Sequence, residues 1–271
     1  MTTPGIRGSL SGVERAVAAW QARPHDARPL VLTDFDGTLA EFNLDPDAVT
    51  LTASRQILLQ TLSHRADLSA GIVSGRRISD LRERVPAAPS MFFAGLHGLE
   101  IEGPGLKFAH KAVALAAPGL SLLAKDLRRA VKPLPGVFVE DKTYSIALHV
   151  RGASKADQLH AITRFNALSE PLLSEGTVRL QPGDNVLELL PNVDWAKGDA
   201  VRAIMRHVEA DTREAVWPVY LGDDATDEDA FEEIGTNGLT IAVGKRPAGA
   251  AFQIDDPAAV EYFLKAILAT E

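Results

Sequence analysis

The sequence predicts an α/β protein in which a doubly wound parallel sheet carries an inserted α+β domain. Short, continuous apolar runs alternate with helical patterns along the chain, and such runs are typical of parallel strands buried on both faces. In the middle of the chain this alternation gives way to the order αββαββ. With 271 residues, of which 46% are hydrophobic and 24% charged, the chain is long enough for two folded domains.

The strands predicted for the parallel sheet are the apolar runs at residues 30–32, 68–73, 91–93, 216–221 and 239–243. Helices are predicted where apolar residues recur on one face, at 201–208 and at 260–268. Strand–helix–strand alternation implies right-handed crossovers, and therefore a Rossmann-like sheet. Ligands of such a sheet bind at the carboxyl ends of its strands.

The insert is predicted from its turn and capping signals. Its expected elements are a helix at 112–131, strands at 137–140 and 144–151 around a turn at Asp141-Lys142-Thr143, a helix from Ser154, and strands at 177–180 and 186–190. Ser154 followed by Asp157 resembles a capping box. The predicted division is a core at 1–106 and 188–271 and an inserted domain at 107–187.

The composition and charge of the chain limit which cellular compartment and which partners are expected. The chain has no cysteine, which excludes disulfides, thiolate metal sites and cysteine nucleophiles. Its net charge is −8, so nucleic acid and anionic membranes are not expected as partners. Residues 1–12 lack the apolar stretch of a signal peptide, and the uncharged, predominantly apolar run at 112–124 is too short to span a membrane. We expect a cytoplasmic monomer.

Two carboxylates follow the first predicted strand, in the segment Asp34-Phe35-Asp36-Gly37-Thr38. Because the chain turns at the end of the strand, both acids can face one site, and the glycine permits a close backbone approach. The alternative is an ordinary turn with solvated carboxylates.

Two further strand ends carry groups that suit an anion. Ser74-Gly75-Arg76 combines a hydroxyl and a guanidinium, which can both bind a phosphate. The alternative is that Ser74 is a simple helix N-cap. Lys197 opens a predicted helix, where a cation is unfavourable unless it has an anionic partner. The alternative for Lys197 is a side chain that extends into solvent.

The segment from Gly222 to Asp229 contains five acids within seven residues, directly after a predicted strand. These carboxylates repel one another unless a cation or a lysine neutralises them. An EF-hand loop is excluded because its sixth position requires glycine and is Glu228 here. The chain also lacks the P-loop, dinucleotide-binding, zinc-protease and serine-hydrolase motifs.

Taken together, these four segments resemble the motifs of the haloacid dehalogenase superfamily of phosphohydrolases, in the same order and at the same strand ends. The insert is similar to that superfamily's type-two cap. A narrower resemblance, to the trehalose-6-phosphate phosphatases, covers residues 30–245. The segments that carry it are Asp34 to Ala48, Gly95-Leu96-His97-Gly98-Leu99-Glu100 (G-x-H-G-x-E), Glu140-Asp141-Lys142, Ala147 to Arg151, Gln181-Pro182-Gly183 with Glu188, and Gly222 to Phe231.

The resemblance implies hydrolysis of trehalose 6-phosphate, the last step of trehalose biosynthesis, through an aspartyl-phosphate. It implies that Asp34 is the nucleophile and Asp36 the general acid and base. Mg²⁺ would be held by Asp34, the backbone carbonyl of Asp36, and Asp223. The groups implied to hold or orient the phosphoryl oxygens are Thr38, Ser74, Lys197 and, through Lys197, Asp227. Those implied to bind substrate are Arg76, His97, Gly98, Glu140, Lys142 and Glu188.

Three alternatives remain at this point. A phosphatase for sucrose phosphate or another sugar phosphate shares the core motifs. A phosphomutase of the same superfamily would retain the phosphoryl group. A catalytically inactive, carbohydrate-binding regulator is the alternative from a different class.

Overall fold

The computed structural model describes residues 11–43, 45–86, 88–142, 144–245 and 249–269. Most of the segment searched for a signal peptide, and Thr143 of the predicted turn, therefore lie outside the described residues. The chain forms two compact units. One contains the described residues up to Asn43, Asp47–Leu106 and the described residues from Ala196 onward; the other is formed mainly by Lys107–Trp195.

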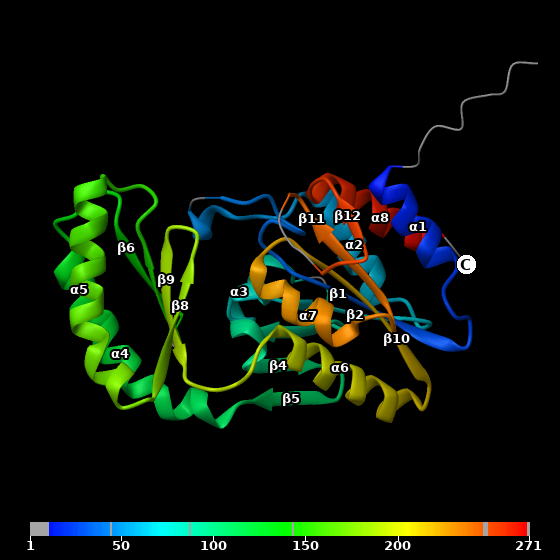
Figure 1. Cartoon of the computed structure of the whole chain (residues 1–271). Helices are drawn as coiled ribbons and strands as arrows, with labels where there is room; N and C mark the ends of the chain where they lie inside the picture. Colours follow the sequence, from blue (N-terminus) through cyan, green and yellow to red (C-terminus); the bar gives the residue numbers. More distant parts are fainter. Residues whose placement is uncertain (1–10, 44, 87, 143, 246–248, 270–271) are drawn as a thin grey trace, which may run out of the picture. The chain divides into compact units, whose positions relative to one another are not determined.

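The first unit contains all strands but the last of an eight-stranded sheet in the order β12-β11-β10-β1-β2-β3-β4-β5 (Figure 1). The strands are β1 (Ala27–Thr33), β2 (Ser69–Val73), β3 (Phe92–Gly95), β4 (Glu100–Gly103), β5 (Leu106–Ala109), β10 (Ala215–Gly222), β11 (Leu239–Val243) and β12 (Phe252–Ile254). Pairing is parallel from β12 to β3, which confirms the predicted parallel sheet. β4 pairs antiparallel to β3 and was not predicted, because its four residues include two glutamates and no apolar run.

Helices flank this sheet (Figure 1). They are α1 (Gly12–Gln21), α2 (Ala53–Ser63), α3 (Ile78–Arg84), α6 (Lys197–Thr212), α7 (Glu228–Ile234) and α8 (Pro257–Ala269), with 3₁₀ turns η1 (Pro46–Ala48), η2 (Leu96–Gly98) and η3 (Ala225–Asp227). The predicted apolar face of α6 is buried at Val201, Ile204 and Val208. In the residues that the structure describes, no helix combines the length and the apolar character needed to cross a bilayer.

The second unit has the predicted αββαββ order and a four-stranded antiparallel sheet, β6-β7-β9-β8. Its elements are α4 (Lys111–Val131), β6 (Phe138–Asp141), β7 (Ile146–His149), α5 (Lys155–Ser174), β8 (Val178–Gly183) and β9 (Val186–Pro191). Apolar residues of both helices and of the sheet form its core, including Leu127, Phe165 and Leu189. The predicted cap at Ser154 is present, since its side chain accepts a hydrogen bond from the Asp157 amide.

The boundary of the second unit differs from the predicted end at residue 187. β9 pairs with β7 on one side and β8 on the other, so its full length belongs to the small sheet. The unit therefore extends to Trp195, and Glu188, which the prediction assigned to the core side of the boundary, lies within it.

Candidate active site

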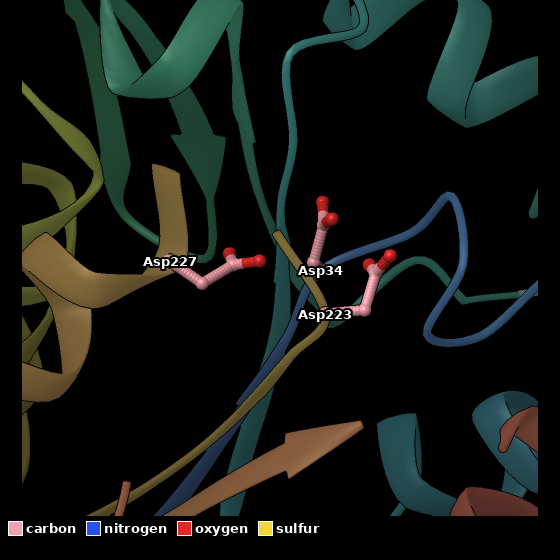
Figure 2. Close-up of side chains that lie close together, drawn as sticks. All are labelled: Asp34, Asp223 and Asp227. Atoms are coloured by element: carbon pink, nitrogen blue, oxygen red, sulfur yellow. The ribbon is translucent and has the colours of Figure 1, made fainter. Parts of the chain in front are cut away.

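The carboxyl ends of three neighbouring strands bring the predicted motifs together. Asp34 follows β1, Ser74 follows β2 and Asp223 follows β10, and β1 lies between the other two strands. The Asp34 amide donates to the Leu221 carbonyl over 2.8 Å, which ties the first motif to β10. Figure 2 shows Asp34, Asp223 and Asp227 gathered at this edge.

Lys197, the first residue of α6, is buried between two of these acids. Its Nζ lies 2.7 Å from Asp227 Oδ1 and 3.2 Å from Asp34 Oδ1. Burial alone would lower the pKa of Lys197, but the charges of Asp227 and Asp34 raise it above its ordinary value. The lysine is therefore a fixed positive charge beside Asp34, and the alternative of a solvent-exposed side chain is wrong.

Asp227 is fully buried, and hydrogen bonds occupy both of its oxygens. Oδ1 also accepts from the Tyr220 hydroxyl at 2.8 Å, and Oδ2 accepts from the Asp224 amide at 2.9 Å. These contacts suit the predicted task of orienting Lys197. Sequence reasoning missed Tyr220 because it lies within an apolar strand, where an aromatic ring is expected for packing alone.

Asp34 and Asp223 are crowded carboxylates in a mostly buried setting. Burial raises the pKa of Asp34 well above its ordinary value, although Lys197 opposes the shift. Burial and the charge of Asp227 raise the pKa of Asp223 to about 7, although the Thr38 hydroxyl, which donates to Asp223 over 3.0 Å, lowers it. The ionised forms of both acids are therefore costly without a further positive charge.

The residues at this edge fit a divalent cation. Asp34, Asp223 and Asp227 each offer an oxygen, and these oxygens lie within 4.8 Å of one another. Gly37 keeps space beside Asp223, because a Cβ there would lie 2.2 Å from Asp223 Oδ2. Carboxylate oxygens are the ligands that Mg²⁺ prefers. Since both Asp227 oxygens already accept hydrogen bonds, Asp34 and Asp223 are the better candidates for ligands.

Arg76 contacts acids of the protein in this structure. Its Nε and Nη2 donate to the two oxygens of Asp36 over 2.6 and 2.7 Å, and its Nη1 donates to Asp80 over 2.9 Å. Bidentate pairing fixes the orientation of a carboxylate as well as its charge. Arg76 was predicted to bind substrate, which stays a prediction, and in this structure its guanidinium lies against the predicted general acid.

The loop after β2 lies against the turn after β3, which brings Ser74, His97 and Gly98 into one region. The His97 amide donates to the Ser74 carbonyl over 2.9 Å. A Cβ added to Gly75 would lie 2.9 Å from His97 Nε2, so the imidazole packs directly on that glycine. The N-cap of α3 is Arg77, so the alternative that Ser74 is its N-cap is wrong.

The second unit contains three residues that were predicted to bind substrate, and they lie near one another: Glu140, Lys142 and Glu188. Lys142 Nζ donates to Glu188 Oε1 over 3.0 Å, and the Ser145 hydroxyl donates to the same oxygen over 2.7 Å. Glu140 and Glu188 are both paired with Ala147 on β7, so they lie in one row across the sheet. Burial alone would raise the pKa of Glu140, but hydrogen bonding to His149 and the charge of Lys142 hold it below its usual range.

Comparison with protein families identifies one match over most of the chain. The trehalose-phosphatase family model matches residues 32–256. Trehalose-phosphate phosphatase of Mycobacterium ulcerans is 38% identical over 242 residues, and that of Mycobacterium tuberculosis is 37% identical over 242 residues. Each alignment covers 87% of this chain and 60% of the relative, so the chain spans about 60% of the length of these curated relatives.

Solved structures share the fold at low sequence identity. The C-terminal domain of Candida albicans trehalose-6-phosphate phosphatase has a TM-score of 0.76 at 22% identity, covering 100% of this chain and 99% of that one. A haloacid dehalogenase-like hydrolase from Bacteroides thetaiotaomicron has a TM-score of 0.61 at 13% identity, covering 88% and 98%. These likenesses establish the α/β architecture.

Proposed function

Because this chain belongs to the trehalose-phosphatase family, we propose that it hydrolyses trehalose 6-phosphate to trehalose and inorganic phosphate. The observation that carries the proposal is the placement of Lys197 between Asp34 and Asp227, with Asp223 beside them. This arrangement combines a carboxylate nucleophile with fixed positive charge, which a dianionic phosphate monoester requires.

The proposed reaction has two steps. A carboxylate oxygen of Asp34 attacks phosphorus, an aspartyl-phosphate forms, and the bond from phosphorus to the sugar oxygen breaks as Asp36 gives that oxygen a proton. Water then attacks phosphorus, Asp36 takes a proton from the water, and phosphate leaves with Asp34 restored. Dividing one difficult displacement into two lowers the barrier of each.

Other side chains of this edge would hold the phosphoryl group during both steps. The Thr38 and Ser74 hydroxyls and the Lys197 ammonium are the proposed donors to its oxygens. Asp227 keeps Lys197 oriented through the 2.7 Å hydrogen bond. Asp34, Asp223 and the backbone carbonyl of Asp36 would hold Mg²⁺, which, when bound, supplies positive charge against the phosphate dianion.

Replacing the proposed general acid should affect poor leaving groups most. Asp36→Asn is expected to slow hydrolysis of a sugar phosphate by roughly 10²–10⁴-fold, because general acid–base help is worth that much. An aryl phosphate has a better leaving group, so its phosphoenzyme should form faster in this variant than the phosphoenzyme from the sugar phosphate. Rapid-quench measurement of phosphoenzyme formation tests this, and an equal loss for both substrates would count against Asp36 as the acid.

We further propose that Glu140, Lys142 and Glu188 recognise the sugar. Charged side chains make stronger hydrogen bonds to hydroxyls than neutral ones do. Glu140 and Glu188 lie on one small sheet, and Lys142, directly after β6, contacts Glu188. The alternative is a purely structural salt-bridge cluster. The Lys142 and Glu188 side chains are only 14% and 11% exposed, so their pairing costs more desolvation than a surface ion pair and is a less natural choice for stability alone.

Alanine variants separate these two possibilities. Glu140→Ala, Lys142→Ala and Glu188→Ala should each lower kcat/KM for trehalose 6-phosphate by about tenfold or more, which corresponds to one lost charged hydrogen bond. Hydrolysis of a small aryl phosphate, which has no sugar to recognise, should hardly change. Arg151→Ala is a matched control, because Arg151 forms an exposed ion pair with Asp184 in the same unit. Uniform losses on both substrates would indicate a structural role.

A phosphate-release screen over sugar phosphates tests the proposed function itself. Trehalose 6-phosphate should be the preferred substrate, ahead of sucrose 6-phosphate and monosaccharide phosphates. Preference for another sugar phosphate would overturn the substrate assignment. Isomerised sugar phosphate without free phosphate would indicate a mutase, and binding without turnover would indicate a regulator.

A further inference from the structure

Glu100 joins β4 to the beginning of α3. Its Oε1 accepts a hydrogen bond from the Ile78 amide over 2.7 Å, and Ile78 is the first residue of that helix. The N-cap residue itself, Arg77, makes no side-chain hydrogen bond to the helix end. Glu100 therefore supplies from a neighbouring strand the acceptor that the N-cap lacks, and its negative charge suits this helix end.

Gly95 leaves the space in which Glu100 approaches the Ile78 amide. A Cβ at Gly95 would lie 2.7 Å from Glu100 Oε1, 2.8 Å from the Arg76 carbonyl and 2.8 Å from the Ile78 amide nitrogen. The φ angle of Gly95 is −101°, which any residue adopts, so glycine is needed here for space rather than for conformation. The first and last residues of the G-x-H-G-x-E segment thus form a single packed contact with the loop that follows β2.

Backbone hydrogen bonds also connect the turn after β3 with the loop that follows β2. The Leu96 amide donates to the Arg76 carbonyl and the His97 amide to the Ser74 carbonyl, each over 2.9 Å. Leu96 and His97 have φ angles of 53° and 57°, a region that non-glycine residues rarely occupy. Such backbone persists only where the surroundings hold it, and the contacts with the 74–78 loop do so.

The 74–78 loop carries two groups of the proposed mechanism. Ser74 is a proposed donor to the phosphoryl group, and Arg76 holds both oxygens of Asp36. The hydrogen bond that holds Ile78 limits the movement of both residues, because Ser74 and Arg76 precede Ile78 by only four and two residues along the same loop. Glu100 can therefore influence phosphoryl transfer without contacting the substrate.

We infer that Glu100 is a positioning residue, which sets Ser74 and the Arg76–Asp36 pair through its hydrogen bond to the Ile78 amide. The inference rests on the phosphoryl-transfer chemistry of the proposed function but not on the identity of the sugar. Glu102 is a matched control. It lies on the same strand and pairs over 3.4 Å with Arg82 of the same helix, a residue outside the 74–78 loop.

The test compares kcat/KM for p-nitrophenyl phosphate, together with thermal unfolding, in the full chain and four variants. Glu100→Ala removes the acceptor, and Glu100→Asp keeps the charge but is one carbon too short to reach Ile78. Both should lower kcat/KM by about tenfold or more, as misplaced catalytic groups do. Glu100→Gln keeps an acceptor oxygen at full length and should retain most of the activity, as should Glu102→Ala.

Several results would overturn the inference. Glu100→Gln falling as far as Glu100→Asp would mean that charge, and not the hydrogen bond, matters. Equal losses in Glu100→Ala and Glu102→Ala would reduce Glu100 to a general strand–helix contact, and so would losses that follow the unfolding temperature. If Glu100→Ala does not fold, the Asp and Gln variants provide the comparison. A wild-type chain that cleaves the aryl phosphate but not trehalose 6-phosphate would refute the proposed function and leave this inference intact.

Discussion

Asp34→Asn should abolish phosphate release and leave the fold intact. The substitution removes the attacking oxygen but hardly changes volume, and loss of a nucleophile in a covalent mechanism commonly costs about 10⁴-fold or more in kcat. Burial, together with the charges of Asp227 and Asp223, disfavours the ionised Asp34 carboxylate. A neutral amide removes that cost, so the variant should unfold at or above the wild-type temperature despite the weaker contact with Lys197.

Two measurements check this expectation. Phosphate release from an aryl phosphate and from trehalose 6-phosphate gives the loss of activity, and circular dichroism during heating gives the stability. Asp47→Asn is a suitable control, because Asp47 lies in η1 and has no place in the proposed mechanism. Trapping a phosphoryl group on a residue other than Asp34 would refute the nucleophile assignment.

Removing divalent cations should also abolish activity, and Mg²⁺ should restore it. Asp34 and Asp223 are both acids whose ionised forms are disfavoured by burial, and the substrate would add a dianion beside them. Lys197 is one positive charge against this group, which is too little to neutralise it. Phosphate release in excess chelator, with and without added Mg²⁺, measures the dependence, and full activity in chelator would contradict it.

A binding measurement without substrate makes the same test independent of turnover. A cation that binds the folded chain and not the unfolded one raises the unfolding temperature as its concentration increases. Mg²⁺ should therefore stabilise the wild-type chain, and Asp223→Ala should lose most of that stabilisation. Asp229→Ala is the control, because Asp229 belongs to the same acidic segment but lies on α7, outside the group of carboxylates that could hold a metal.

The sequence by itself determined the parallel sheet, the order of its motifs and the family. These features depend on local patterns, namely apolar runs followed by acids, a hydroxyl or a lysine. Such patterns can be recognised in the sequence before the fold is known. The αββαββ insert was also predictable, because its turns and its Ser154 cap are signalled by neighbouring residues. β4 was not, since a strand of four residues with alternating glutamates has no apolar run to identify it.

Only the tertiary structure decided which charged groups meet. Arg76 could have been assigned to a phosphate or to a carboxylate with equal chemical sense, and only the packing of two loops places it on Asp36. Tyr220 and Glu100 have roles set by partners that lie seven and 22 residues away in the sequence. Hydrophobic periodicity can be recognised in a short stretch of sequence. Hydrogen-bond partners, by contrast, often come from different helices and strands, and these approach one another only when the chain folds.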